Sequence, residues 1–348
     1  MPRPNGPRRL SLILTRRHLL RRAGQAGALA LTLPAWRRAA RAQSLAKVRV
    51  VVATAPIEPN HHYFLYAQAR GFYKQAGIDV DIRSIRGDVN VLRAVIAGDA
   101  DVGNVAAYAA LAAGNAGAKV KILGAFTPRF DSHIGARKTI GSLKELEGKT
   151  FACSGVGDIS QIGPMLCIEQ AGGDPRKVQW ITVGSGSARI LGLIGGAFEA
   201  TAFNTVYVKR VSSYDYLHVL AEQAKVLPQF IYTWEVASPA MLAKKELLAA
   251  FWLATARGVR WGQENPAEAA KISQDFLPDQ PKEEVAFQLD TYARNKHWVV
   301  DGVLPQPFWD FTTDALLRHE LVAKVPSYGD FVVNDFALAA RQALSTQR

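Results

Sequence analysis

The sequence predicts an α/β protein with two parallel-sheet lobes and a helical C-terminal segment. Runs rich in valine and isoleucine alternate with helical patterns between residues 47 and 125, and a second series of this kind runs from residue 143 to residue 203. After Leu242 the strand patterns nearly vanish and helical ones dominate. Repeated strand–helix–strand units with short turns build parallel sheets covered by helices on both faces. Two such series therefore indicate two lobes.

The first series begins with a valine-rich run at 47–53, which is typical of a buried strand. A helix is expected at 63–75 because Gly77 follows it, and another at 89–97 because Gly98 follows it. The other expected elements are a short strand at 80–82, a strand end at 101–104, an alanine-rich helix at 106–113 and a strand at 120–125.

The second series repeats this alternation, and glycine pairs again follow its longer helices. Large aromatic residues of the C-terminal segment are expected to pack the core. The expected elements of the second series are a short helix at 143–146, a strand at 150–154, a helix at 159–169, a strand at 178–183, a helix at 188–193 and a strand at 200–203. The expected C-terminal helices are at 245–263, 266–276, 282–296 and 306–323.

Composition and charge exclude several classes of protein. A chain of 348 residues with 49% hydrophobic residues can bury two cores and is too apolar to be disordered. The net charge of +12 comes mainly from residues 1–42, whose 10 Lys and Arg residues leave 32 bases against 30 acids in the rest. A nearly neutral body argues against a nucleic-acid-binding surface. With only Cys153 and Cys167, a disulfide framework and a cysteine-based zinc site are excluded.

Residues 1–42 are expected to be a cleaved export signal. An arginine pair at 16–17 precedes a short apolar stretch at 23–36, and alanines at 40 and 42 follow that stretch. This order resembles a twin-arginine signal, with a mature start at Gln43 and a periplasmic destination. The alternative is an uncleaved basic amphipathic arm, which is disfavoured because glycines and a proline interrupt any helical stripe.

A search for catalytic motifs leaves no candidate enzyme site. The sequence has no phosphate-binding P-loop, zinc-protease or serine-hydrolase motif. The glycines of 154–160 (SGVGDIS) follow a strand and open a helix, but they lack the third glycine of the dinucleotide fingerprint. His61 and His62 are adjacent and have no partner three or four residues away to complete a metal site. The sequence therefore predicts no catalytic residue, cofactor or metal.

Several motifs together resemble one family. They are Asn60-His61, AQARGFYKQAGIDV at 67–80, AGDADV at 97–102, IGSLKELEGKT at 140–150, LGLIGGAFEA at 191–200 and VVNDFALAA at 332–340. The order and spacing of these motifs resemble the periplasmic solute-binding proteins of nitrate/sulfonate/taurine and thiamine-pyrimidine-precursor ABC importers. The resemblance implies a type II-like periplasmic binding protein fold with a ligand cleft between the lobes. It implies 43–127 with 229–348 as lobe I and 128–228 as lobe II.

The resemblance also implies which residues line the cleft, all of them at strand ends or helix starts. Four have alternative interpretations: Asn60 and Asp158 as helix caps, His61 as a surface histidine and Phe203 as a core residue. Arg189, at a position that is often basic in the family, is interpreted as structural. The expected ligand-binding residues are Thr54, Pro56, Asn60, His61, Asn104, Val105, Gly155, Val156, Gly157, Asp158, Ile159, Phe203 and Asn204.

The expected function is capture of a small organic molecule and its delivery to an ABC permease, which is driven by a separate ATPase. The protein is expected to be a monomer that is not an enzyme and binds no nucleic acid. One alternative is an enzyme on the same scaffold acting on a pyrimidine-like heterocycle. Another, the sensing domain of a transcription regulator, is disfavoured because residues 1–42 are too short for a DNA-binding helix-turn-helix. Pyrimidine-like compounds, sulfonate, nitrate and aromatic acids all remain open as ligands, with a neutral or weakly acidic molecule favoured.

Overall fold

The computed structural model describes residues 45–155 and 157–346. The predicted export signal and Val156 lie outside the described residues. Among the helices that are described, none is both long and apolar enough to cross a membrane. Cys153 and Cys167 are buried free thiols.

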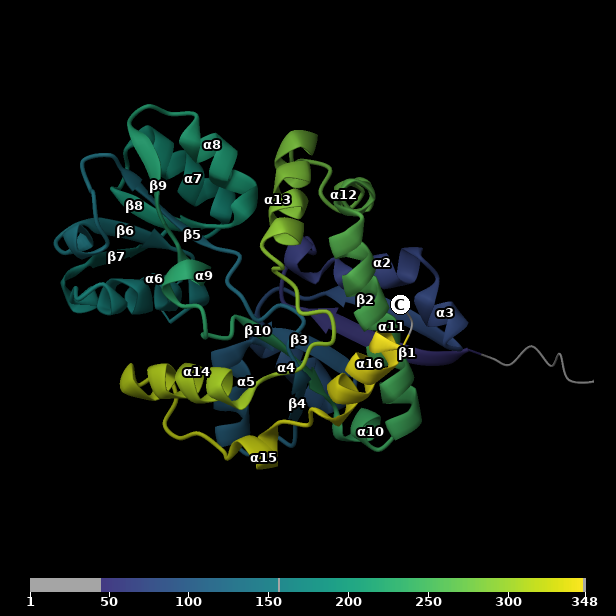
Figure 1. Ribbon diagram of the computed structural model, residues 1–348. Coiled ribbons are helices and arrows are strands. Elements are labelled where there is room, and N and C mark those ends of the chain that lie inside the picture. Colours follow the sequence, from purple (N-terminus) through teal and green to yellow (C-terminus); the bar gives the residue numbers. More distant parts are fainter. Residues whose placement is uncertain (1–44, 156, 347–348) are drawn as a thin grey trace, which may run out of the picture. The chain divides into compact units, whose positions relative to one another are not determined.

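The first of two sheets has five strands in the order β2-β1-β3-β10-β4 (Figure 1). β1 pairs in parallel with β2 and β3, whereas β10 runs antiparallel to both β3 and β4. This sheet and the helices packed on it form the first lobe. Its strands are β1 (Ala46–Val52), β2 (Ile78–Ser84), β3 (Val102–Ala106), β4 (Lys121–Gly124) and β10 (Thr233–Ala237).

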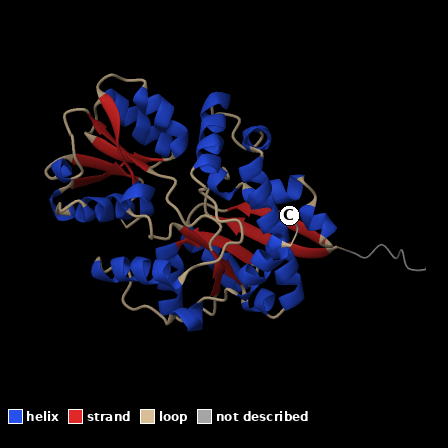
Figure 2. Cartoon of the chain, in the orientation of Figure 1, coloured by secondary structure: helices blue, strands red, loops and turns tan. Residues whose placement is uncertain are grey.

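The second sheet also has five strands, in the order β7-β6-β8-β5-β9. β6 pairs in parallel with β7 and β8, and β5 runs antiparallel to β8 and β9. Helices flank both sheets (Figure 2), so the chain has two α/β lobes, as the sequence predicts. The strands of the second lobe are β5 (His133–Arg137), β6 (Thr150–Cys153), β7 (Gln179–Thr182), β8 (Ala200–Phe203) and β9 (Leu217–Glu222).

Each sheet is therefore mixed and not purely parallel, because one antiparallel strand enters it. These two strands, β5 and β10, are the first strands formed after the chain passes from one sheet to the other. The two connecting segments lie side by side, since Tyr232 N donates to Pro128 O at 2.8 Å and the rings of Phe130 and Phe230 stack 5.2 Å apart. We propose the lobe boundaries near residues 128 and 228 on this basis.

Most helices begin and end close to the expected residues. The expected helix at 63–75 is instead two helices, because Gly71 between them adopts a positive φ of 69°. The helices of the first half are α2 (Tyr63–Ala69), α3 (Phe72–Gln75), α4 (Asp88–Ala97), α5 (Ala107–Asn115), α6 (Ile159–Gln170) and α7 (Gly186–Gly195). Those that follow are α8 (Val208–Ser212), α9 (Gln223–Val226), α10 (Pro239–Leu242), α11 (Lys245–Glu264), α12 (Pro266–Gln274), α13 (Lys282–Arg294), α14 (Gln306–Arg318), α15 (Tyr328–Phe331) and α16 (Asp335–Ser345). Four 3₁₀ turns complete the described elements: η2 (Pro59–His61), η3 (Lys144–Leu146), η4 (Pro175–Lys177) and η5 (Thr205–Tyr207).

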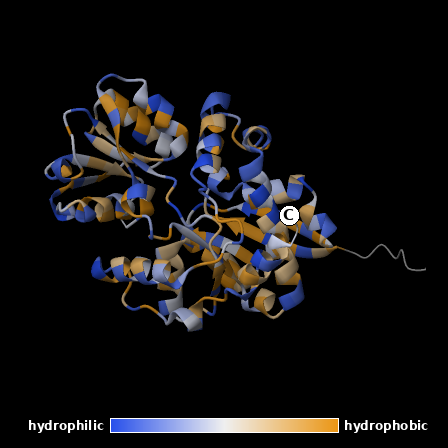
Figure 3. Cartoon of the chain, viewed as in Figure 1, coloured by the Kyte–Doolittle hydropathy of each residue, from blue (hydrophilic) through white to orange (hydrophobic). Residues whose placement is uncertain are grey.

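Apolar side chains cover both faces of the first sheet. Along β1, Val48, Val50 and Val52 pack with α2 and α11, whereas Val51 packs on the opposite face with α4 and α5. This split follows from the two-residue period of a strand. Figure 3 shows the strands largely in hydrophobic colours and the outer turns of the helices in hydrophilic ones. Both faces are therefore largely apolar, and the buried polar side chains Asn104 and Glu235 within β3 and β10 are exceptions that pair with each other.

Close packing of α11 on α2 gives a first prediction. A methyl group added at Gly258 would lie 2.6 Å from Tyr63 O and 2.7 Å from Ala67 Cβ, which is closer than atoms can approach. Gly258→Ala should therefore lower the free energy of unfolding by about 1–3 kcal/mol. Gly195→Ala on α7 is the matched control, since nothing lies within 4 Å of its added methyl group. Urea denaturation of both variants checks this, and equal stabilities would contradict it.

Candidate functional site

The candidate site lies where the strand ends of the two lobes meet. Glu58 follows β1 in the first lobe, and Asn204 follows β8 in the second. Asn204 Nδ2 donates to Glu58 Oε2 at 2.8 Å. The carboxyl ends of parallel strands are where α/β proteins bind ligands. This hydrogen bond therefore joins the ligand-facing edges of both sheets.

The loop after β1 is organised around Thr54. Its hydroxyl accepts the backbone N–H of Glu58 at 3.2 Å and lies 3.3 Å from His61 Nδ1. The loop contains a cis peptide bond before Pro56, an exposed residue, and ends in η2. The loop thereby brings Thr54, Glu58 and His61 together at the end of the strand.

A buried hydrogen-bond network fixes the orientation of His61. Asn104 Nδ2 donates to Glu235 Oε1 at 2.9 Å, so Asn104 Oδ1 faces His61 Nε2, 2.8 Å away. The Nε2–H of His61 must therefore donate to that oxygen, and Nδ1 is left to accept the hydroxyl proton of Thr54. Tyr63 OH also donates to Glu235 Oε1, at 2.6 Å, and Phe126 N donates to Oε2 at 3.1 Å.

Burial sets the charge of this network. It lowers the pKa of His61 to about 3 and raises the pKa of Glu235 to about 7. His61 is 2% exposed, so it is a buried neutral imidazole and the surface interpretation is wrong. Asn60 is also buried, and its side chain makes no cap to its helix. Asn60, His61 and Asn104 are therefore buried beneath the loop after β1.

In the second lobe, helix starts supply the polar groups. Asp158 caps α6, accepting Ser160 N at 2.9 Å, and Ser185 caps α7, accepting Ala188 N at 3.3 Å. The capping interpretation of Asp158 is thus confirmed. Gly155, Gly157 and Ile159 lie in the same turn and helix start.

Two predicted residues lie in the cores of the lobes. Phe203 is 1% exposed and packs over Gly135, where an added methyl group would lie 2.3 Å from the ring. Val105 is completely buried in the core shared by the sheet and α4. Both side chains shape the strand ends from behind, and the core interpretation of Phe203 is confirmed.

Arg189 lies near this junction with a structural role. Its guanidinium donates to Ala202 O at 3.2 Å and to Gly184 O, which ties the start of α7 to the end of β8. Within the described residues it forms no ion pair, and burial lowers its pKa. The nearest charges that act on it include Asp158 and Glu58. Arg189 is therefore a buried cation at the edge of the site.

Two acidic residues of the site were not found from the sequence. Burial and then the negative charge of Asp131 raise the pKa of Glu58 to about 7. Burial also raises the pKa of Asp131 to about 6, although this carboxyl accepts Thr205 N at 3.1 Å and Gln288 Nε2 at 2.8 Å. Glu58 stands two residues before the Asn-His pair, and this position was the only signal that pointed to it.

Helix α13 of the first lobe contacts the second lobe through further polar groups. Arg210 of α8 forms a two-point ion pair with Glu284, with N–O distances of 3.1 and 2.8 Å. Gln280 Nε2 donates to Tyr207 OH at 3.2 Å. Bidentate pairs of this kind fix geometry as well as energy. These contacts bridge the lobes beside the candidate site.

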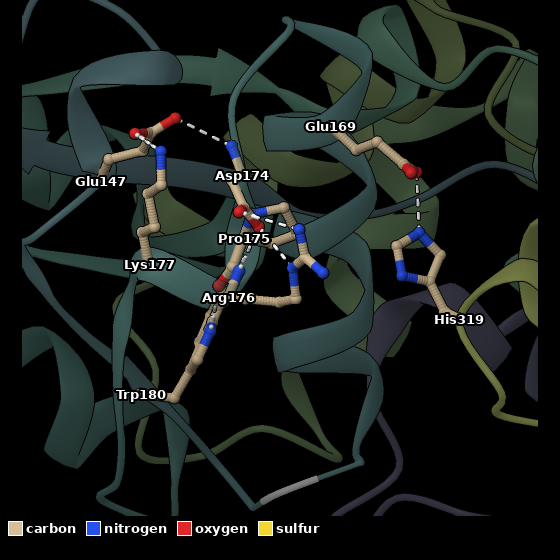
Figure 4. A network of polar contacts seen from close by, with 8 residues as sticks. All are labelled: Glu147, Glu169, Asp174, Pro175, Arg176, Lys177, Trp180 and His319. Atoms are coloured by element: carbon tan, nitrogen blue, oxygen red, sulfur yellow. Dashed lines mark hydrogen bonds and ion pairs between the residues drawn. The ribbon is translucent and has the colours of Figure 1, made fainter.

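A second polar network lies around η4, just before the amino ends of β6 and β7 (Figure 4). Arg176 pairs with Asp174 and Lys177 with Glu147, and all four are local partners on the surface of the second lobe. Glu169 of α6 contacts His319 beyond α14 at 2.7 Å. A surface cavity of about 580 Å³ is lined by these residues, and another of about 710 Å³ lies beside α5 and α15. Neither cavity includes a predicted site residue.

Metal-binding geometry is not present in the described part of the chain. No three His, Cys, Asp or Glu side chains there are arranged to hold a metal ion. The polar groups of the candidate site are carboxyl, amide, hydroxyl and neutral imidazole groups. Such a set can donate and accept hydrogen bonds.

Sequence comparison places the chain in a family. The family model described as NMT1/THI5 like matches residues 58–269, which is more than half of the chain. The chain belongs to the NMT1/THI5-like family. The match begins at Glu58 and covers every ligand-binding residue expected from the sequence except Thr54 and Pro56. It confirms the resemblance that the motifs indicate.

This family member also resembles proteins of known structure or description. YtlA of Bacillus subtilis (strain 168), whose name designates it a binding protein, is 20% identical over 85% of this chain and 90% of its own length. The alkanesulfonate-binding protein SsuA from Xanthomonas axonopodis pv. citri is 16% identical, with a TM-score of 0.64 over 83% of this chain and 98% of that one. The periplasmic nitrate-binding protein NrtA from Synechocystis PCC 6803 is 13% identical, with a TM-score of 0.66 over 87% and 90%. These likenesses confirm the periplasmic binding protein fold.

Proposed function

We propose that this protein is an extracytoplasmic solute-binding protein that captures a small organic molecule and delivers it to an ABC permease with a separate ATPase. The observation that supports it most directly is the Glu58–Asn204 hydrogen bond, which joins the strand ends of both lobes. Relatives named for binding alkanesulfonate and nitrate share the fold. A periplasmic location after export through a twin-arginine signal, and a monomeric state, are parts of the same proposal.

The ligand is held between the lobes. We assign direct contacts to Thr54, Pro56, Glu58, Asn204 and the described residues of the turn before α6, which are Gly155 and 157–159. The buried residues His61 and Asn104 position the loop after β1, and Asn60, Val105 and Phe203 support it. Entry of a ligand separates Glu58 from Asn204 and gives each a new partner. Polar groups that are satisfied only by the right ligand supply the specificity.

Thermal unfolding of the full chain against a compound panel tests this function. The panel contains pyrimidines, sulfonates, nitrate, aromatic acids and amines. A ligand at a hundredfold excess over its Kd should add about 2.7 kcal/mol of stability. A clear rise in Tm with the compound recovered intact supports a binding protein. Consumption of the compound would instead favour the enzyme alternative, and no rise with any class would contradict the proposal.

A further inference from the structure

The junction of the lobes holds two carboxyl groups with no positive partner. Glu58 accepts Asn204 Nδ2, and Asp131 accepts Thr205 N and Gln288 Nε2, so the hydrogen bonds to both come from neutral groups. Within residues 45–155 and 157–346, neither carboxyl forms an ion pair with Lys, Arg or His. Asp131 is 2% exposed and Glu58 is half-buried. Buried carboxylates are normally paired with a cation or protonated, and no Lys, Arg or His among the described residues lies within ion-pair distance of either group.

A separate observation comes from Gln288 on α13. Its Nε2 donates to Asp131 Oδ2 at 2.8 Å and to Tyr292 OH at 3.0 Å, which fixes the orientation of the amide. Its Oε1 is then a buried acceptor that receives no hydrogen bond from any described residue, and the residue is only 1% exposed. A buried acceptor left without a donor costs about 1–3 kcal/mol. The oxygen therefore marks a place for a donor beside Asp131.

Acceptor oxygens therefore meet at this junction from both lobes. Glu58 and Gln288 supply them from the first lobe and Asp131 from the second. Neither carboxyl has an ion-pair partner among the described residues, so the junction suits a group that is positively charged and donates hydrogen bonds.

We propose that the ligand carries a protonated amine or amidine group, which lies between Glu58 and Asp131 and donates to Gln288 Oε1. This inference rests on the proposed solute-binding function and names its ligand class. An ammonium or amidinium group supplies both the missing charge and the missing donors, in charge-assisted hydrogen bonds. An anion at the same place would face two carboxyl groups. This proposal differs from the neutral or weakly acidic ligand that the sequence favours.

The raised pKa values of the two carboxyl groups agree with this assignment. In the free protein, burial raises the pKa of Glu58 and of Asp131, and the charge of Asp131 raises that of Glu58 further. Arg189 is the smallest influence on Glu58 and does not neutralise it. A cation between the two carboxyl groups would remove the repulsion and hold both ionised.

Matched sets of ligands test the class directly. Primary amines and amidines are compared with alcohols, carboxylates and sulfonates of the same carbon skeleton, by calorimetric titration of the full chain. Binding of amines or amidines with a Kd at least about tenfold lower than their neutral and anionic counterparts supports the proposal. If a sulfonate, carboxylate or pyrimidine binds and no amine does, the ligand class is wrong and the solute-binding function stands. If no class binds, the solute-binding function fails with it.

Variants test the position of the amine. Glu58→Gln keeps the shape of the side chain and should weaken amine binding about 10- to 100-fold. Asp290→Asn, which removes the same charge from an exposed ion pair with Arg294 on α13, is the matched control and should leave the Kd unchanged. Asp131→Asn is the second variant, with its Tm recorded because the residue is buried. Equal amine affinity in Glu58→Gln, Asp131→Asn and Asp290→Asn would overturn the assignment.

Discussion

Replacing Asn104 with alanine should lower the free energy of unfolding by about 3 kcal/mol. Asn104 is completely buried and links two other buried polar groups, accepting from His61 and donating to Glu235. Loss of the Asn104 amide leaves the Nε2–H of His61 without its acceptor, 2.8 Å away. It also removes one hydrogen-bond donor from the buried carboxyl of Glu235. Water cannot compensate without opening the sheet between β3 and β10, because the surrounding core is dry.

Chemical denaturation followed by circular dichroism measures this effect. The control is Asn90→Ala on α4, an exposed amide whose nearest hydrogen bond is to Arg86 O at 2.9 Å, and its change should stay within about 0.5 kcal/mol. A loss below about 1 kcal/mol for Asn104→Ala would show that the network contributes little to stability. The same variant should also weaken ligand binding, because His61 would no longer hold the loop after β1.

The sequence predicts the strands of the two strand–helix series and misses β5, β9 and β10, of which β5 and β10 have a physical explanation. β1 ends in a run of three buried valines, Val50–Val52, and all four residues of β8 are buried, which is the pattern of strands covered on both faces. β5 is hidden because Gly135 interrupts it, and that glycine is needed where the ring of Phe203 packs. β10 is hidden because Glu235, a charged residue, stands in the middle of a fully buried strand. Contacts with the rest of the fold stabilise β5 and β10 as strands, and their local sequences do not predict this.

The candidate site is predicted in part for a similar reason. Motif order selects Asn60, His61, Asn104 and Asn204, and the structure joins His61 and Asn104 by a buried hydrogen bond, with Asn60 buried beside them. No sequence pattern marks Glu58 and Asp131 as site residues, because a single carboxyl in a loop is normally solvated. They gain importance only because the lobes bring them together, 73 positions apart in the sequence.

The affinity for an amine should fall as the pH drops below about 7. In the free protein the pKa is about 7 for Glu58 and about 6 for Asp131, and a bound cation requires both groups to be deprotonated. For each carboxyl that must lose a proton before the amine binds, Kd rises about tenfold per pH unit below the pKa of that carboxyl. Kd should therefore be nearly constant above pH 8 and about 100-fold higher at pH 5 if only Glu58 contributes. If Asp131 contributes as well, the increase should approach about 1000-fold.

The sign of this dependence separates a basic ligand from an acidic one. An anion would bind more tightly as the carboxyl groups take up protons, so its Kd would fall over the same range. Burial lowers the pKa values of His61 and His133 to about 3 and 4, so neither titrates in this range, and Arg189 stays charged. Glu235, behind the loop after β1, has a pKa raised by burial to about 7 and titrates in the same range as Glu58. The Glu58→Gln variant separates these two carboxyl groups. Calorimetric titrations from pH 5 to 8, with an amine whose own pKa exceeds 10, measure the slope. In the Glu58→Gln variant, the change of Kd near pH 7 should disappear and the change near pH 6 should remain. If the variant shows the same dependence of Kd on pH as the unmodified protein, a group other than Glu58 titrates.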